Sequence, residues 1–186
     1  PMFGEMRRKN QLLTPEERAA VLHRGTSGVL ALAGDGDYPY AVPISYVYTN
    51  RKLYFHCAKS GHKLDAIGRC PKASFCVVDQ DQVEPLAYTT HYRSVIAFGT
   101  IRVLEDDREK RAAIEALAVK YAPEDSVEHR ERYIQQDWAS VCLLEMAIDH
   151  LSGKKERELA RERRREARRL GEETRAESER RGRDLK

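Results

Sequence analysis

The chain lacks the residue spacings on which most metal and thiol redox sites depend. Its four cysteines, Cys57, Cys70, Cys76 and Cys142, form no CxxC pair, and its six histidines show no HxH or HxxxH spacing. Zinc sites and thioredoxin-like motifs need such spacings. We therefore expect no metal site, and cysteines used in this way are typical of a reducing cytoplasm.

Long apolar segments are also missing. No apolar run approaches the ~20 residues that span a bilayer. The start of the sequence, Met2 to Gln11, is charged and has no apolar stretch of the kind found in signal peptides. These features predict a cytoplasmic protein with no membrane partner.

The common nucleotide-binding motifs are absent as well. The sequence has no GxGxxG, and the segment Ala58–Lys63 lacks the first glycine of a P-loop. The predicted elements do not alternate between strand and helix as in a βαβ protein. Rossmann and Walker sites are therefore excluded.

Positive charge is concentrated at one end of the chain. The net charge is +3, but residues 154–186 contain 14 Lys/Arg and 9 Asp/Glu, so this segment carries +5 and the remainder −2. We predict a folded domain over residues 1–153 and a charged, basic extension over 154–186. We expect this extension to be a solvated helical or disordered tail, since a few oppositely charged pairs spaced i,i+3 weakly favour a helix. Nucleic-acid binding is not expected except through this tail, which could also bind an acidic partner.

The most informative segment is Leu53–Ile67, where an apolar strand runs into a turn that opens a short helix. The turn carries Lys59, Lys63 and His62, and the helix is expected to stop at Gly68. The start of a helix presents N–H groups and a positive dipole end, so added lysines favour an anion, most often a phosphate. The alternative is a surface turn with ordinary capping.

The segment Tyr38–Tyr48 predicts a strand with two unlike faces. One face carries bulky residues, among them Val42 and Ile44, and the other carries small ones, among them Pro43 and Ser45. Prolines remove hydrogen-bond donors, so we expect an open edge or an irregularity here. The small face could accept a flat ligand, or the prolines could serve only to protect an edge strand from aggregation.

The remaining elements favour a mainly β (α+β) fold, an antiparallel split β-barrel of about six strands with flanking helices. Capping boxes are expected at Thr14–Glu17 and Asp106–Glu109, and a hairpin turn is expected at Asp35–Asp37. The other expected elements are strands at Gly28–Ala33, Lys52–His56, Ala73–Val78, Arg93–Leu104 and Val141–Ile148, helices that begin near Pro15, Asp106 and Val127, an irregular acidic segment at Asp79–Leu86, and a stop at Ser152–Gly153.

Several single residues allow both a functional and a structural interpretation. His62 could bind a ligand ring or exchange protons near neutrality, or could be partly exposed without a role. His56 is expected to pack locally, and Cys57 to be a small packing residue rather than a nucleophile. Trp138 is expected in a core or an interface, and Tyr88–Ser94 either in a ligand-facing loop or at the rim of a strand.

Taken together, the motifs resemble the 5-nitroimidazole resistance proteins, a family within the pyridoxamine 5′-phosphate oxidase-like superfamily. The resemblance covers Met2 to about Lys155. It is carried by Met2–Phe3, Met6–Lys9, Gln11–Leu13, Tyr38–Pro43, Tyr54–His56, Gly61–Lys63, Asp65–Ile67, Ser74–Gln80, Tyr88–Thr90, Arg93–Ile96 and Phe98–Thr100. It implies a split-barrel homodimer that binds FMN at the subunit interface.

The resemblance also implies an activity and a set of site residues. The activity is FMN-dependent reduction of nitroaromatic compounds, with His62 as the catalytic candidate. The alternatives are a flavin- or haem-binding split barrel without turnover, or an oxidase like pyridoxamine 5′-phosphate oxidase. The expected cofactor contacts are Val42, Pro43, Ile44, Ser45, His56, Cys57, Ala58, Lys59, Ser60, His62 and Lys63, with Tyr92, Ser94 and Trp138 from the second subunit. Cys57 departs from the family pattern, where serine is expected, and the basic tail lies outside the family core.

Overall fold

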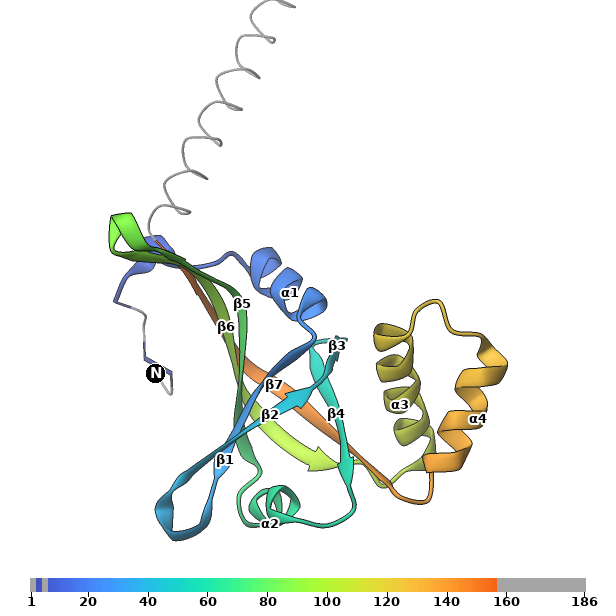
Figure 1. Cartoon of the computed structure of the whole chain (residues 1–186). Helices are drawn as coiled ribbons and strands as arrows, with labels where there is room; N and C mark the ends of the chain where they lie inside the picture. The colour runs from blue at the N-terminus through green and yellow to red at the C-terminus, as the bar shows by residue number, and fades with distance from the viewer. Residues whose placement is uncertain (1–2, 5–6, 157–186) are drawn as a thin grey trace, which may run out of the picture.

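The computed structural model describes residues 3–4 and 7–156 of the 186-residue chain. Four α-helices and seven strands lie within these residues (Figure 1). The helices are α1 (Pro15–Arg24), α2 (His62–Arg69), α3 (Asp107–Tyr121) and α4 (Val127–Asp137). The strands are β1 (Ser27–Ala33), β2 (Pro39–Ser45), β3 (Val47–Thr49), β4 (Lys52–Ala58), β5 (Lys72–Glu84), β6 (Thr89–Val103) and β7 (Val141–Lys155).

All neighbouring strands pair antiparallel in a single sheet with the order β2-β1-β5-β6-β7-β4-β3. The two edge strands, β2 and β3, follow each other in the chain and are separated only by Tyr46. The sheet therefore curls until its edges meet at that residue, without a hydrogen-bonded ladder between them. This confirms the predicted antiparallel split barrel, with seven strands in place of about six.

The barrel interior is filled by alternate residues of the strands, as the two-residue period of a strand requires. Phe75 lies at its centre and is fully buried. Its ring packs edge-on against Tyr46 (4.8 Å between centroids) and Phe55 (5.1 Å). On β2 the bulky residues Val42 and Ile44 pack against this core, so the predicted alternation of faces is confirmed.

Helix α1 closes one end of the barrel with the buried side chains of Val21 and Leu22. The predicted capping box is present, because the Thr14 hydroxyl accepts from Glu17 N and the Glu17 carboxylate accepts from Thr14 N. Glu17 also accepts a hydrogen bond from Lys155 Nζ at 2.8 Å, which fastens the end of β7 to this helix.

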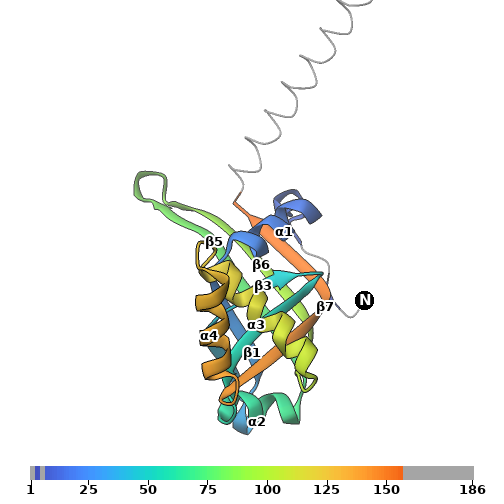
Figure 2. The same ribbon diagram turned by 90° about the vertical axis from the view of Figure 1, so that its right-hand side faces the viewer.

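Helix α3 lies against the outer side of β4 and β7, and α4 packs against α3 (Figures 1 and 2). A second, smaller core joins α3 to the sheet through Val47, Leu104, Ala113, Leu117 and Leu143. The second capping box was predicted wrongly. Asp106 caps α3 by accepting from Arg108 N and Glu109 N, but the Glu109 carboxylate pairs with Arg102 instead, at 2.7 and 3.0 Å.

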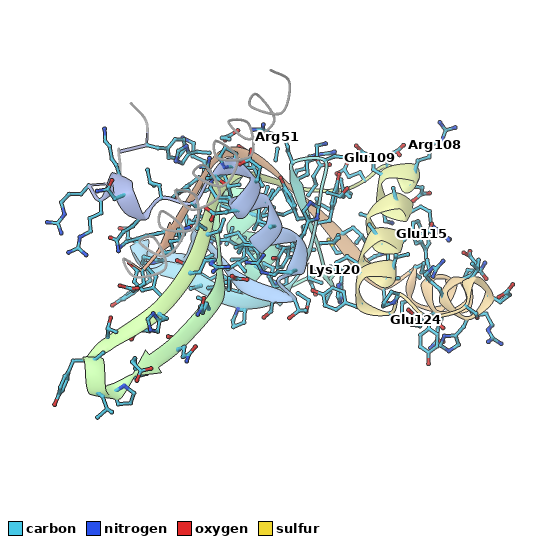
Figure 3. The ribbon with its side chains drawn as sticks, turned by 90° about the horizontal axis from the view of Figure 1, so that it is seen from above. Arg51, Arg108, Glu109, Glu115, Lys120 and Glu124 are labelled. Carbon is cyan, nitrogen blue, oxygen red and sulfur yellow. The ribbon has the colours of Figure 1, made fainter. Side chains whose placement is uncertain are left out.

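The segment Asp79–Leu86 was also predicted wrongly, as irregular. Strand β5 continues to Glu84 and pairs with the start of β6 beyond a bulge between Val78 and Gln80. The end of β5 from Asp79 to Glu84 and the start of β6 from Thr89 to Arg93 project from the barrel as an arm (Figures 1 and 3). This part of β5 was not predicted as a strand because its composition is polar. The charge of Asp79 is balanced locally, because the carboxylate accepts from Arg24 at 2.5 and 2.6 Å.

The last strand does not stop at Ser152–Gly153, as the sequence suggested, but runs on to Lys155. Gly153 is required there for close packing and not for a turn. A Cβ at Gly153 would lie within 2.9 Å of Leu13, whose N–H donates to Gly153 O at 3.0 Å. Lys154 and Lys155 of the predicted extension thus belong to β7, and residues 157–186 lie outside the described residues.

No helix within the described residues is long and apolar enough to cross a membrane. In the same part of the chain, no cluster of three or more His, Cys, Asp or Glu side chains could hold a metal ion.

A buried carboxylate joins β4, β6 and β7 on the side that α3 covers. Glu145 is buried and accepts from Lys52 at 2.9 Å and from Arg102 at 3.0 Å. Burial alone would raise the pKa of Glu145, but these hydrogen bonds hold it below its ordinary value. A lowered folded-state pKa stabilises the protein above the unfolded-state pKa, and the contribution disappears as the pH falls through the folded-state value.

We expect Glu145→Ala to lower the free energy of unfolding at pH 7 by about 1–3 kcal/mol, since a charge-assisted pair is lost while its half-exposed cations can still reach water. The difference from wild type should shrink below pH 4. Urea unfolding followed by circular dichroism at pH 7 and at about pH 3 measures both effects. Glu109→Ala is the matched control and should cost about 0–1 kcal/mol, because its pair with Arg102 is exposed. An equal loss for both variants at pH 7 would contradict the role given to Glu145.

Candidate functional site

The predicted anion-binding turn connects the end of β4 to the start of α2. Gly61 is the N-terminal cap of α2 and has φ +126°, a conformation that side chains with a Cβ rarely adopt. No side chain caps this helix, and no atom lies within 4 Å of the position where a Cβ would be. The start of α2 is therefore open, and a ligand can approach its N–H groups closely.

Two lysines border this opening. Lys59 and Ser60 are exposed and Lys63 is half-buried. None of their three side chains makes a hydrogen bond or an ion pair with any residue in the described ranges. Uncompensated cations beside an uncapped helix start are what a phosphate group requires, so the geometry fits the anion-binding interpretation of this turn.

His62, the catalytic candidate, is turned toward the β1–β2 hairpin. Its Nδ1 lies 3.2 Å from the Asp35 carboxylate, and its ring packs edge-on against Tyr40 at 4.5 Å. Arg69 at the other end of α2 contacts the same carboxylate at 2.6 Å. The hairpin and α2 are thus held together by Asp35, and the Nε2 side of His62 is left for other contacts.

Cys57 points into the barrel, away from the outer surface. It pairs in register with Cys142 of β7, and it packs against the main core. Burial, reinforced by the neighbouring Cys142 thiol, raises the pKa of Cys57 to about 11, although Lys63 opposes the shift. A thiol with so high a pKa is a poor nucleophile, which favours the packing interpretation.

The outer surface of β2 and β4 contains four of the seven ring contacts expected on these strands. Pro43 and Ser45 on β2, and His56 and Ala58 on β4, are the residues whose side chains alternate away from the core. The small outer face of β2 is exposed along Pro39, Ala41 and Pro43. In contrast, Val42, Ile44 and Cys57 face inward, so only their backbone groups are available to a ligand on this surface.

The end of β2 is fixed by α3. The backbone N–H of Tyr46 donates to the Tyr121 hydroxyl at 2.9 Å, and Lys120 Nζ donates to Tyr46 O at 2.9 Å. Figure 3 shows Lys120 on the side of α3 that faces the strands. These contacts hold the adjoining Ser45 at the mouth of a cavity.

This cavity, which we call the α3–α4 cavity, has a volume of about 310 Å³ and lies between the two helices and the outer surface of the barrel. Its lining residues are Ser45, His56, Ile114, Leu117, Ala118, Tyr121, Tyr133, Ile134, Asp137 and Val141. Only Ser45 and His56 were predicted as site residues. The helical residues were missed because an apolar stripe on a helix predicts core packing as readily as a ligand pocket.

The three residues expected from a second subunit lie in two separate places. Tyr92 is part of the arm, and Ser94 lies at its base opposite Lys154. The arm and α2 are at opposite ends of the barrel (Figures 1 and 2), so one protomer does not bring Tyr92 or Ser94 to the turn. Trp138 lies at the C-terminal end of α4, and Lys110 Nζ is 4.5 Å from the centroid of its ring. Three residues later, Val141 pairs with Ala58 in the ladder between β7 and β4.

Comparison with known proteins gives a family and a set of similar structures. Residues 14–155 match the family described as pyridoxamine 5′-phosphate oxidase. None of the curated proteins compared with the chain matches it.

Many solved structures share the fold. A proposed 5-nitroimidazole antibiotic resistance protein from Bacteroides thetaiotaomicron is 18% identical with a TM-score of 0.68, over 77% of this chain and 86% of that one. An FAD and haem binding protein from Mycobacterium smegmatis is 25% identical with a TM-score of 0.66, over 79% and 73%. An FAD-binding protein from Mesorhizobium loti is 24% identical with a TM-score of 0.59, over 78% and 97%.

Proposed function

The chain belongs to the pyridoxamine 5′-phosphate oxidase family, and on this premise we propose that it is a cytoplasmic flavin-dependent oxidoreductase that binds FMN and reduces nitroaromatic compounds. The observation that carries the proposal is the uncapped start of α2, where the cations of Lys59 and Lys63 have no partner within the described residues. This start lies next to β2, whose small face is exposed, and His62 of α2 contacts Tyr40 of β2. A phosphate and a flat ring system joined in one molecule suit these two neighbouring surfaces.

In this proposal the residues of the chain bind and orient the cofactor. Lys59, Ser60 and Lys63 hold the phosphate together with the first N–H groups of α2. The outer surface formed by Pro43, Ser45, His56 and Ala58 supports the ring, and the inward-facing residues Val42, Ile44 and Cys57 contribute backbone groups only.

Bound FMN would supply the electrons that reduce a nitro group. The chain supplies hydrogen-bond and proton donors at the outer surface, from the hydroxyl of Ser45 and the imidazole of His56. His62 is retained as a cofactor-side residue that acts through Nε2, since Asp35 lies against its Nδ1. Helices α3 and α4 limit the access of water to this end of the site.

We further propose that two copies of the chain form a homodimer through the outer face of β1, β5 and β6. No helix in the described residues covers this face, and apolar side chains lie in register across it. Val29 pairs with Cys76, which pairs with Ile96, and the neighbouring Val78 is 63% exposed. Exposed apolar patches of this kind favour an interface.

The arm supports the same assembly. Leu86 and Tyr88 at its tip are 94% and 97% exposed, which is unusual for large apolar side chains outside an interface. An arm that reaches a second subunit would carry Tyr92 and Ser94 toward the partner's cofactor, and Trp138 would approach the interface from α4.

Anaerobic turnover tests the proposed activity. Protein loaded with FMN, reduced with dithionite and freed from excess reductant should transfer electrons to metronidazole, with the visible flavin absorbance returning as the nitro absorbance is lost. Free FMN at the same concentration is the control. If bound FMN were reoxidised by metronidazole no faster than free FMN, the protein would be a flavin carrier without nitroreductase activity. A Soret band in place of flavin absorbance would identify a haem protein and overturn the proposal.

A further inference from the structure

The α3–α4 cavity has a mostly apolar lining. Its apolar part is made by three side chains of α3, by Ile134 of α4 and by Val141 of β7. The three on α3 are Ile114, Leu117 and Ala118. At about 310 Å³ the cavity lies at the lower end of the volumes that hold small ligands, a size that suits one aromatic ring with short substituents.

Several polar groups at the cavity have no hydrogen-bond partner in the described part of the chain. The Ser45 hydroxyl and the His56 imidazole on the strand side make no hydrogen bond there, and neither does the Asp137 carboxylate on the helix side. The Tyr121 hydroxyl is different, because it is already bonded to the backbone of Thr26 and Tyr46. The Ser45 hydroxyl and the His56 imidazole on the strand side, and the Asp137 carboxylate on the helix side, are therefore available to hydrogen-bond a ligand.

The only charge that the lining side chains carry by residue type is negative. Asp137 contributes a carboxylate, and no lysine or arginine is among the lining residues. Two lysines of α3 are engaged in other contacts: Lys120 with the backbone of Tyr46, and Lys110 over the ring of Trp138. An anionic ligand would meet the Asp137 carboxylate without a compensating cation among the lining residues, and because Asp137 is exposed the repulsion is moderate and depends on salt.

We propose that the α3–α4 cavity binds an uncharged, planar molecule of a single aromatic ring. Within the function proposed above, on which this last step depends, the cavity is the substrate site and selects neutral nitro compounds over phosphorylated pyridines. Ser45 and His56 belong both to the cavity and to the proposed cofactor surface, so a ring held here lies beside that surface.

The single tryptophan of the chain reports on this cavity without any flavin. Trp138 directly follows Asp137 and precedes Val141 by three residues, and both of these line the cavity. Nitro compounds quench tryptophan fluorescence. We expect 4-nitrobenzyl alcohol, titrated into the flavin-free protein, to quench Trp138 along a saturable curve. 4-Nitrobenzoate, which has the same ring and nitro group but a negative charge, should bind ~3- to ~10-fold more weakly at low salt, because Asp137 is exposed and its repulsion is screened.

Two variants localise the binding. Ala118→Leu fills the cavity and should remove the saturable component, whereas Ala112→Leu, on the exposed face of the same helix, should leave it unchanged. Asp137→Asn should bring the affinity for 4-nitrobenzoate close to that for the alcohol. Purely linear quenching, equal affinities for the two probes in the wild type, or no effect of Ala118→Leu would each overturn the proposal.

Flavin titrations separate this inference from the proposed function. Saturable quenching in a protein that binds no FMN would support the cavity and refute the flavin oxidoreductase. Displacement of 4-nitrobenzyl alcohol by FMN would show that the flavin itself fills the cavity, and would overturn the inference while the proposed function stands.

Discussion

Replacing both Lys59 and Lys63 with alanine is expected to weaken FMN binding by about 2–4 kcal/mol, or ~30- to ~1,000-fold in Kd. Each lysine lacks a partner within the described residues, so in the proposed complex each is available for a charge-assisted bond to the phosphate. Lys63→Ala alone should cost about 1–3 kcal/mol. Quenching of FMN fluorescence on titration with protein measures these affinities, and the losses should become smaller at high salt.

A matched variant separates specific contacts from general charge. Lys72→Ala removes an exposed lysine from the start of β5, shortly after the far end of α2, and should change the Kd only a few-fold at low salt. If the double variant kept the wild-type affinity, or if Lys72→Ala matched its loss, the assignment of the phosphate to the turn would be wrong.

Tyr46→Ala is expected to lower the free energy of unfolding by about 3–5 kcal/mol, the range for truncating a large buried aromatic side chain. Tyr46 is fully buried between β2 and β3, and its ring packs against Phe75 and lies 4.0 Å from Lys120 Nζ. Its hydroxyl donates to Leu22 O at 2.8 Å. Burial accordingly raises the pKa of Tyr46 well above its usual range.

The conservative variant divides this effect into parts. Tyr46→Phe keeps the ring but leaves the Leu22 carbonyl without this donor, and should cost about 1–2 kcal/mol. Urea unfolding followed by circular dichroism measures both losses. A cost below 1 kcal/mol for Tyr46→Ala would show that the meeting point of the two edge strands does not depend on this side chain.

Local patterns predicted much of the fold. The capping box at Thr14–Glu17, the alternation along Tyr38–Tyr48 and the helix after Gly61 all depend on interactions between residues close in sequence, and each appears in the structure. The errors have long-range causes. Pairing between Gln80–Glu84 and Thr89–Arg93 outweighs a polar composition that resembles a loop. Gly153 serves the packing of Leu13, a residue about 140 positions earlier in the chain.

The same distinction between local and long-range interactions applies to the candidate site. The turn from Lys59 to Lys63 is contiguous and could be recognised from spacing alone. The α3–α4 cavity could not, because Asp137 and Ala118 are brought to Ser45 and His56 only by the packing of α3 on the sheet. Alternation could have shown that Cys57 faces the core while its neighbours face outward. The positions of Tyr92 and Ser94, at the far end of the protomer from α2, follow from strand pairing that the sequence did not reveal.

The most direct test of the central claim is a comparison of FMN with riboflavin, which lacks the phosphate, in equilibrium titrations of the flavin-free wild-type protein. We expect FMN to bind with a shifted visible spectrum and at least ~30-fold more tightly than riboflavin, in line with the loss expected for the lysine variant. That preference should disappear when Lys59 and Lys63 are both alanine. Equal affinity for the two flavins in the wild type, or no flavin binding, would contradict the claim that this turn holds the phosphate of FMN.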